Sequence, residues 1–414
     1  MRVLFAVSSW RGHYFCTVPL GWALRAAGHE VLFACSADQC DAVRAAGLVA
    51  VPVLDGIDWP TLMLLLYYLD VVQGRRSGLP LHPYTRRRVR SLDEFDFEAE
   101  WGRFRENALA VMVRSYDAAV DLARRWRPDL IVHDLTAPEG MLAAEVTGVP
   151  SVWHPPGLLG TAEVDPAVDI GFWDKSGSFE RYGHQPYATA RIRYVVDPSP
   201  EAVVPPMGSS VRLGMRYVPY NGPAVLPGWL REPASRPRVC VLWGSSAAAE
   251  AEAIPVLRAA IEAACEHGAE VVLTLSQDQR EELGELPAGV RTLTGFPLHL
   301  LLETSDAIIH HGSANTLLTA AAAGTPQLAV PYTDDRIAVS RRMTATGAVL
   351  SVPVAEAAHE EAGQLSAAVA ALLTDPARRA AARLLREQIA AQPSPADLVA
   401  PLERLARTGT LSAA

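Results

Sequence analysis

One stretch late in the chain has the residue types of an anion-binding turn: His310-His311-Gly312-Ser313-Ala314-Asn315-Thr316. The residues before it, from Asp306 to Ile309, predict a buried strand, and those from Ala314 to Ala323 predict a helix. Free N–H groups and the positive end of the helix dipole meet at such a turn, which favours a phosphate or a diphosphate. The imidazole, hydroxyl and amide side chains add further donors. An ordinary strand-to-helix turn with a polar N-cap is the alternative.

A histidine near the N-terminus stands where open parallel sheets bind ligands. Residues Arg2 to Val7 predict a first strand, and His13 lies in the turn after it. Residues Asp129 to His133 predict a later strand of the same sheet, so Asp134 is expected at the same edge. The turn from Ser8 to His13 lacks the spaced glycines of a dinucleotide-binding fingerprint. A structural turn histidine and an aspartate that caps the next helix are the alternatives.

These residues depend on two runs of strands that alternate with helices. Such alternation predicts parallel sheets covered by helices on both faces, and hence an α/β fold. The expected strands of the first run are Arg2–Val7, His29–Ala34, Val49–Val53, Asp129–His133 and Pro150–Trp153. Those of the second run are Val239–Trp243, Glu270–Leu275, Val290–Leu293, Ala307–His310, Gln327–Val330 and Ala348–Val352. Between the runs, from Asp197 to Pro237, prolines are too dense for helices or central strands, so a linker is expected there.

An insertion from Leu54 to Glu106 breaks the first run. It is rich in aromatic side chains, and at the ligand edge of a sheet such an insertion suggests a pocket for a large apolar molecule. The side chains expected to line this pocket are Trp59, Tyr67, Tyr68 and His82. The alternative is that the aromatic side chains form the small core of the insertion itself.

Composition limits the classes of partner. The net charge of −9 disfavours binding to nucleic acid or to an anionic membrane. Five cysteines without metal or redox spacing indicate a reducing compartment. The N-terminal apolar run does not resemble a signal peptide, and the apolar run from Leu62 to Leu69 is too short to span a bilayer. We therefore expect a cytoplasmic protein.

Several further motifs occur in order along the chain. They are Gly12-His13 before Pro19-Leu20, Trp22 to Val31, Arg216 to Pro223, Pro227 to Leu230, His310 to Gly312, Gly324 to Gln327 and Pro331 to Arg336. As an ordered set they resemble the GT-B nucleotide-sugar-dependent glycosyltransferases of glycosyltransferase family 1. More narrowly, the chain resembles the actinobacterial enzymes that attach deoxysugars to macrolides, anthracyclines and enediynes. The resemblance covers nearly the whole chain.

The resemblance implies two doubly wound, Rossmann-like domains that face each other across a cleft. Residues 1–210 would form an acceptor-binding domain, residues 211–236 a proline-rich linker, and residues 237–395 a nucleotide-sugar-binding domain. Residues 396–414 would form a helix that packs back on the first domain.

The implied activity is inverting transfer of a deoxysugar from a TDP-sugar to a small-molecule aglycone such as an antibiotic or polyketide. His13 matches the general base, and Asp134 matches the acid that orients it. A leaving diphosphate is stabilised by hydrogen-bond donors and a helix dipole. Because no Asp-x-Asp metal motif stands at an expected strand edge, we expect neither a metal nor a cofactor besides the TDP-sugar co-substrate.

The resemblance also implies a set of donor-binding positions. They are Gly244, Ser245, Phe296, His311, Gly312, Ser313, Asn315, Thr316, Asp335 and Arg336. Within this set, His311, Asn315 and Thr316 match diphosphate-binding positions, and the loop at Gly244 and Ser245 lies near the diphosphate. Phe296 falls near the nucleobase. Asp335 and Arg336 fall where the family has an acid followed by a glutamine that hold the sugar hydroxyls.

Three departures from the family pattern leave other functions open. Ser313 replaces the usual second glycine, Arg336 replaces glutamine, and the segment from Gly295 to Leu298 is one residue shorter than usual. The changes at Ser313 and Arg336 are compatible with a non-catalytic homologue that activates a partner transferase. This hypothesis is disfavoured by the intact candidate site residues His13, Asp134, His311, Asn315 and Thr316. A sugar-nucleotide epimerase of the same architecture is a third hypothesis, which the aromatic insertion disfavours. A homodimer or an auxiliary protein is the expected kind of protein partner.

Overall fold

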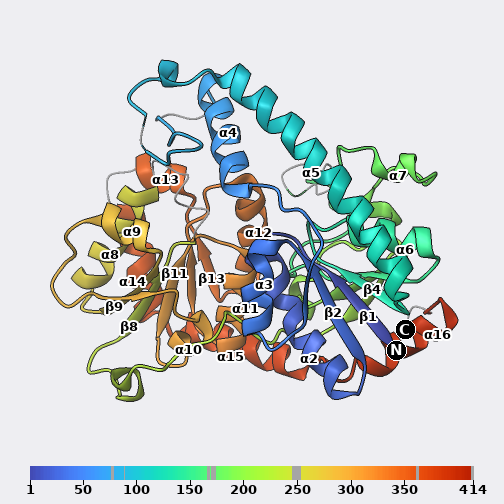
Figure 1. Ribbon diagram of the computed structural model, residues 1–414. Coiled ribbons are helices and arrows are strands. Elements are labelled where there is room, and N and C mark those ends of the chain that lie inside the picture. Colours follow the sequence, from blue (N-terminus) through green and yellow to red (C-terminus); the bar gives the residue numbers. More distant parts are fainter. Residues whose placement is uncertain are drawn as a thin grey trace. The chain divides into compact units, whose positions relative to one another are not determined.

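The computed structural model of the chain describes residues 1–75, 79–87, 89–165, 168, 174–244, 253–359 and 363–411 (Figure 1). The chain divides into two compact units. Unit 1 contains Met1–Asp58, Phe104–Pro223 and Ile389–Ala414, and unit 2 contains Trp59–Arg103 and Ala224–Gln388. Each unit is built on one parallel sheet.

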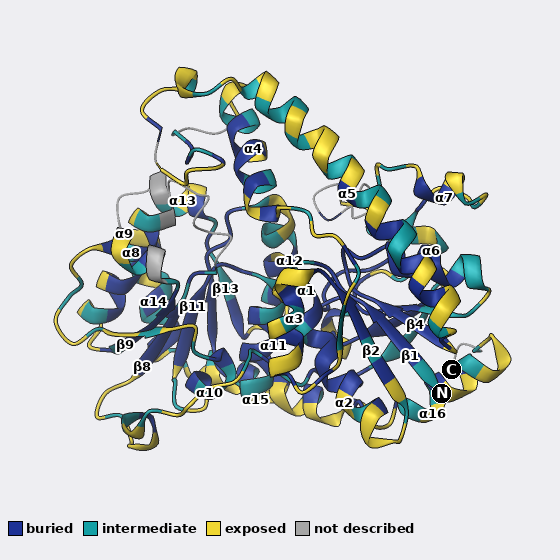
Figure 2. Cartoon of the chain, viewed as in Figure 1, coloured by how far each residue is buried: buried dark blue, intermediate teal, exposed yellow. Residues whose placement is uncertain are grey.

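The sheet of unit 1 has seven strands in the order β3-β2-β1-β4-β5-β6-β7. They are β1 (Arg2–Ala6), β2 (Glu30–Cys35), β3 (Ala50–Pro52), β4 (Leu130–His133), β5 (Ser151–Trp153), β6 (Tyr194–Asp197) and β7 (Val211–Gly214). The central strands β1 and β4 are apolar throughout most of their length and almost fully buried, as is usual for a parallel sheet covered on both faces (Figure 2). Ala6 of β1 is in register with His133 of β4, so these two strands end together.

Helices cover the sheet of unit 1. They are α1 (Arg11–Tyr14), α2 (Val18–Ala26), α3 (Cys40–Ala45), the part of α5 (Phe97–Trp126) from Phe104 onward, α6 (Glu139–Thr147), α7 (Ser178–Arg181) and α16 (Val399–Thr408). The last helix comes from the end of the chain. Leu402 and Leu405 of α16, with Leu398 just before it, pack in the same core cluster as Val3 and Phe5 of β1. Two hydrogen bonds hold the chain that enters α16: Arg216 N–H donates to the Pro393 carbonyl (2.7 Å), and Gln392 Nε2 donates to the Ser199 carbonyl (2.7 Å).

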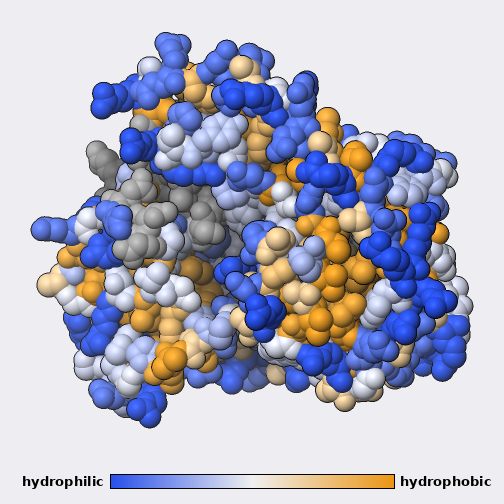
Figure 3. All heavy atoms as spheres, viewed as in Figure 1, coloured by the Kyte–Doolittle hydropathy of each residue, from blue (hydrophilic) through white to orange (hydrophobic). Residues whose placement is uncertain are grey.

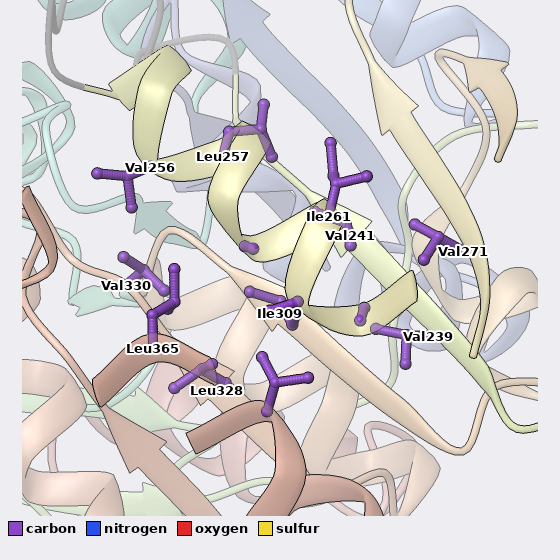
Figure 4. Packing of buried hydrophobic residues seen from close by; sticks show 14 of the residues in the cluster. Val239, Val241, Val256, Leu257, Ile261, Val271, Ile309, Leu328, Val330 and Leu365 are labelled. Carbon is purple, nitrogen blue, oxygen red and sulfur yellow. The ribbon is translucent and has the colours of Figure 1, made fainter. Parts of the chain in front are cut away.

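The sheet of unit 2 has six strands in the order β10-β9-β8-β11-β12-β13. They are β8 (Arg238–Leu242), β9 (Glu270–Leu275), β10 (Arg291–Thr294), β11 (Ala307–His310), β12 (Gln327–Ala329) and β13 (Val349–Ser351). The helices that follow these strands are α8 (Ala253–Glu266), α9 (Gln277–Leu283), α10 (Leu298–Leu302), α11 (Ala314–Ala323), α12 (Asp334–Thr344), α13 (Val354–His359), α14 (Gly363–Thr374) and α15 (Pro376–Ala391), whose last residues belong to unit 1. Figure 4 shows the core on one face, where Val241 and Ile309 of the sheet pack with Leu257 of α8 and Leu365 of α14.

The alternation of strands and helices predicted from the sequence is confirmed: the eleven expected strands occur within one residue of their expected ends. Two strands were not expected, β6 and β7. Both lie in or next to the proline-rich region, and β7 falls inside the expected linker of residues 211–236. The prolines at 198, 200, 205 and 206 lie between these strands, where they lose no ladder hydrogen bond, and β7 is an edge strand.

The surface is of mixed character. On the face seen in Figure 3, hydrophilic residues cover much of the rim, and apolar residues form one broad patch right of centre and several smaller groups. Among the helices of the described ranges, none is long and apolar enough to cross a membrane.

Candidate functional site

Each sheet has one topological switch point, where the strand order reverses. In unit 1 it lies between β1 and β4, and in unit 2 it lies between β8 and β11. At each switch point, the connections that follow the two strands run to opposite faces of the sheet. A crevice forms between these connections, and open α/β sheets bind ligands in this crevice. The residues singled out from the sequence lie at both places.

His13 lies at the switch point of unit 1, in the short helix α1 that begins five residues after β1. The backbone turn closes when the His13 N–H donates to the Trp10 carbonyl (2.9 Å). The imidazole is partly exposed, and its Nδ1 lies 2.8 Å from Thr136 Oγ1, at hydrogen-bond distance. This contact engages Nδ1 with a hydroxyl group of the protein.

Asp134 follows β4 directly and is 1% exposed. Its Oδ2 accepts hydrogen bonds from the Ser8 N–H (2.9 Å) and hydroxyl (2.8 Å), and its Oδ1 accepts from the Thr136 N–H (2.9 Å). Burial raises the pKa of Asp134 to about 6, against the opposing effect of these donors.

Thr136, whose N–H donates to Asp134, is the residue whose hydroxyl lies at hydrogen-bond distance from His13 Nδ1, and the expectation that Asp134 orients His13 stays a prediction. The physical reason for this arrangement is the turn after β4, in which an aspartate side chain accepts from the N–H two residues on. This turn engages the carboxylate and brings the Thr136 hydroxyl to the histidine. Sequence reasoning missed Thr136, and the Asp-x-Thr spacing after a strand is the signal that could have identified it.

The aromatic side chains of the insertion pack against one another. Tyr68 on α4 (Trp59–Val72) is buried, stacks on Phe97 (centroids 5.0 Å apart) and meets Phe95 edge-on (4.4 Å). The His82 ring lies 5.3 Å from that of Phe95. Trp59 and Tyr67 are buried as well, with 5% and 4% of their surfaces exposed. The contacts of Tyr68 and His82 thus fit the alternative interpretation, in which the insertion has its own core, and the insertion groups with unit 2.

His311 follows β11 at the switch point of unit 2, and its ring is held by the loop after β8. Its Nδ1 accepts a hydrogen bond from the Gly244 N–H (3.1 Å), and the Gly244 carbonyl accepts from Gln279 Nε2 (3.0 Å). A Cβ at position 244 would lie 2.7 Å from the His311 ring, so only glycine permits this approach. Because Nδ1 is an acceptor here, the neutral ring carries its proton on Nε2.

His310 fixes the shape of the following turn. Its Nδ1 accepts from the Gly312 N–H (3.0 Å) and its Nε2 pairs with Gln327 Oε1 (3.1 Å). Burial lowers the pKa of His310 to about 4, so the ring is neutral. Gly312 has a φ of 81°, and a Cβ there would lie 2.7 Å from Ser340 Oγ. The turn therefore requires glycine for its backbone and for its packing.

The turn leads into α11, whose N-cap is Ser313. Ser313 Oγ lies 2.9 Å from Thr316 Oγ1, and Asn315 lies in the same first turn, partly buried. The first backbone N–H groups of the helix and its dipole favour a bound anion. The strand and helix predicted on either side of this turn are present, and phosphate binding by the turn stays a prediction.

A cation lies near this turn. Arg336, in the first turn of α12, places its guanidinium 4.4 Å from the ring centroid of Tyr332. Burial first, and the charge of Arg336 second, hold the pKa of His311 well below its usual range. His311 is therefore a neutral donor beside a permanent positive charge. Asp335 is exposed at the start of the same helix.

Two further donor positions were predicted from the sequence, Ser245 and Phe296. Ser245 lies outside the described residues. Phe296 is partly buried against the cluster that contains Leu298 and Leu301, and its carbonyl accepts from Thr274 Oγ1 (3.4 Å). Its expected contact with a nucleobase stays a prediction.

Two family models together match most of the chain. Residues 22–244 match the N-terminal domain of the erythromycin biosynthesis protein CIII-like (EryCIII-like) family, and residues 258–405 match its C-terminal domain.

Individual relatives match over nearly their full length. The chain is 34% identical to 10-deoxymethynolide desosaminyltransferase of Streptomyces venezuelae, covering 98% of this chain and 97% of the relative. It is 35% identical to aklavinone 7-beta-L-rhodosaminyltransferase of Streptomyces galilaeus, covering 98% and 96%. Among solved structures, the glycosyltransferase VinC in complex with dTDP aligns with a TM-score of 0.72 at 30% identity, over 98% of this chain and 100% of VinC.

Proposed function

The chain belongs to the EryCIII-like family of nucleotide-sugar-dependent glycosyltransferases with the GT-B fold, and we propose that it transfers a deoxysugar from a TDP-sugar to a hydroxyl group of an antibiotic-like aglycone. The transfer inverts the anomeric carbon, and His13 acts as the general base.

The observation that carries this proposal is the His311 turn. A neutral imidazole with its proton on Nε2, the N-terminus of α11 and the Arg336 guanidinium lie around one end of β11. A diphosphate needs this combination of N–H donors, helix dipole and positive charge, and needs it more as negative charge grows on the leaving group. A TDP-sugar donor is supported by the dTDP bound to VinC, which aligns with 98% of this chain.

The reaction also needs a base, since a hydroxyl is a poor nucleophile at neutral pH. In the proposed step the acceptor oxygen bonds to the anomeric carbon while its proton passes to His13 Nε2. The bond from the anomeric carbon to the phosphate oxygen breaks, and TDP leaves with the electron pair. Attack on the side opposite the leaving group inverts the anomeric configuration.

The full-length protein should bind TDP and turn over a TDP-deoxysugar with a suitable aglycone. Calorimetry measures TDP binding, and mass spectrometry measures the glycosylated product. His311→Ala should weaken TDP binding by about 10- to 100-fold, the size of a hydrogen bond to a charged group. His267→Ala, an exposed histidine of the same unit, is the matched control.

Equal TDP binding by His311→Ala and the natural protein would refute the donor site. TDP binding without turnover, together with stimulation of a partner transferase, would instead assign the auxiliary role.

A further inference from the structure

We propose that Thr136 is the positioning residue for His13, and that Asp134 acts one step further away by holding the turn that presents Thr136. This inference rests on the proposed role of His13 as the general base. It replaces a histidine–carboxylate pair by a chain of three residues in which a hydroxyl is the middle member.

Hydrogen bonds and one hydrogen-bond-length contact link His13, Thr136 and Asp134. Thr136 is 8% exposed, and its hydroxyl lies 2.8 Å from His13 Nδ1. Its backbone N–H donates to Asp134 Oδ1 (2.9 Å), which fixes the position of the threonine backbone. Asp134 Oδ2 is in turn engaged by two donors of Ser8, the second residue after β1. The carboxylate therefore ties the loops after β1 and β4 together, and these two loops carry His13 and Thr136.

A hydroxyl at this place can select the tautomer of the histidine. When Thr136 Oγ1 accepts the proton of Nδ1, Nε2 is unprotonated and can take the proton of the acceptor hydroxyl. Thr136 neither gains nor loses a proton in the step. After the transfer His13 is an imidazolium, and its Nε2 proton passes to solvent. The direct partner of that imidazolium is a neutral oxygen, with the Asp134 charge held behind it.

This chain makes a different prediction from a direct pair. In a direct pair, the side chain of Thr136 would be a bystander and its loss would not affect the chemical step. In the proposed chain, removal of the hydroxyl frees the ring to rotate and to adopt the wrong tautomer, while donor binding in unit 2 is untouched. The signature is a loss in kcat with little change in the KM for the TDP-sugar.

The experiment compares three variants of the full-length protein. Thr136→Val keeps the shape of the side chain without the hydroxyl, and Thr136→Ser keeps the hydroxyl. Thr147→Val removes a hydroxyl of unit 1 that donates to the Ala143 carbonyl (2.7 Å) within α6, and serves as the control. We expect Thr136→Val to lower kcat by about 10- to 100-fold, a part of the ~100- to 10,000-fold contribution of a general base. The KM for the TDP-sugar should stay within about twofold, and Thr136→Ser should restore at least about half of kcat.

His13→Ala, measured beside these variants, separates the two hypotheses. If His13→Ala is inactive and Thr136→Val turns over normally, the positioning role of Thr136 is refuted and the base is retained. If His13→Ala itself turns over normally, the proposed base is wrong whatever Thr136 does. Should Thr136→Val unfold, the serine variant decides, because a folded Thr136→Ser as slow as His13→Ala would overturn the role of the hydroxyl.

Discussion

The two switch points carry a histidine each, and their surroundings are of opposite electrical character. His13 of unit 1 is partly exposed and contacts a threonine hydroxyl that is held by a buried carboxylate. His311 of unit 2 is buried, accepts a hydrogen bond from a backbone N–H, and lies near an arginine. The first setting suits a ring that becomes positively charged during a reaction, and the second suits a ring that stays neutral and donates to an anion.

The comparison teaches that topology selects the place of a site and the neighbouring residues select its chemistry. Strand order reverses between β1 and β4 in one sheet and between β8 and β11 in the other, so both sheets offer the same crevice. What differs is the side chain or backbone group that meets Nδ1. Variants that exchange or remove these groups test whether His13 serves turnover and His311 serves donor binding.

The largest expected effect is that of His13→Ala. Turnover should fall by ~100- to 10,000-fold, because the acceptor hydroxyl loses its general base. TDP affinity should stay within about twofold, because the histidine of unit 2 and its turn are unchanged. Steady-state kinetics and calorimetry on the same protein preparation measure both. Loss of TDP affinity in this variant would contradict the proposal that His13 serves the chemical step and not donor binding.

Gly244→Ala should give the next largest effect, and this effect should be on TDP affinity instead of turnover. The added methyl group would lie 2.7 Å from the His311 ring and must displace it, at a cost of about 1–3 kcal/mol. TDP affinity should therefore fall by about 5- to 150-fold. Gly102→Ala, a position with open space around it, is the matched control. Unchanged TDP binding in a folded Gly244→Ala protein would show that the ring position does not matter for the donor.

Arg336→Gln should have a smaller effect on the same site. Arg336 is partly exposed, so loss of its charge should weaken TDP binding by about two- to fivefold, and less at high salt. Glutamine restores the residue that the family pattern has here, so the variant also reports on sugar choice. Competition between TDP-sugars with cationic and neutral sugar groups measures that choice. Identical TDP binding at low salt would remove Arg336 from the donor site.

The smallest expected difference concerns acid stability. Burial holds the pKa of His310 at about 4 and that of His311 well below its usual range. The unfolded chain binds these protons from about pH 6.5 downward, so the free energy of unfolding of unit 2 falls as pH drops towards 4.

In unit 1, burial likewise lowers the pKa of His133 and His154 to about 4, but two carboxyl groups act in the opposite direction. Burial raises the pKa of Asp134 to about 6 and that of Glu139 to about 7. The folded state takes up these protons before the unfolded state does, which stabilises unit 1 as pH falls from 7 to about 4. Hydrogen exchange at pH 7 and pH 5, corrected for the intrinsic rates, should show the larger loss of protection in unit 2. Equal losses of protection in both units would contradict the predicted stabilising effect of the two carboxyl groups in unit 1.

Much of this arrangement could be predicted from the sequence, because strands in parallel sheets are apolar runs and helices end at glycines. The switch points follow from the order of these elements, and so do the places of His13 and His311. The pairings around them could not be predicted in the same way. Whether His13 Nδ1 meets Asp134 or Thr136 depends on about one residue of turn geometry, and the approach of Gly244 to His311 joins segments 67 residues apart in the chain.

The insertion shows a second limit. An aromatic side chain such as Tyr68 has the same appearance in a sequence whether it lines a pocket or fills a core. Its stacking on Phe97 depends on how α4 and the start of α5 meet, and no local pattern encodes that. The same holds for β7, a four-residue edge strand whose pairing with β6 spans a proline-rich segment.

The core position of the last helix has a consequence for synthesis on the ribosome. Leu398, Leu402 and Leu405 complete the core of unit 1, whose other segments end at Pro223. The ribosome must add roughly 190 further residues after that point, which takes on the order of 10 to 40 s at common rates. During this time the nascent chain exposes the apolar groove that α16 will fill, while unit 2 can already have its complete sheet. The unit whose synthesis begins first is thus the last to complete its core.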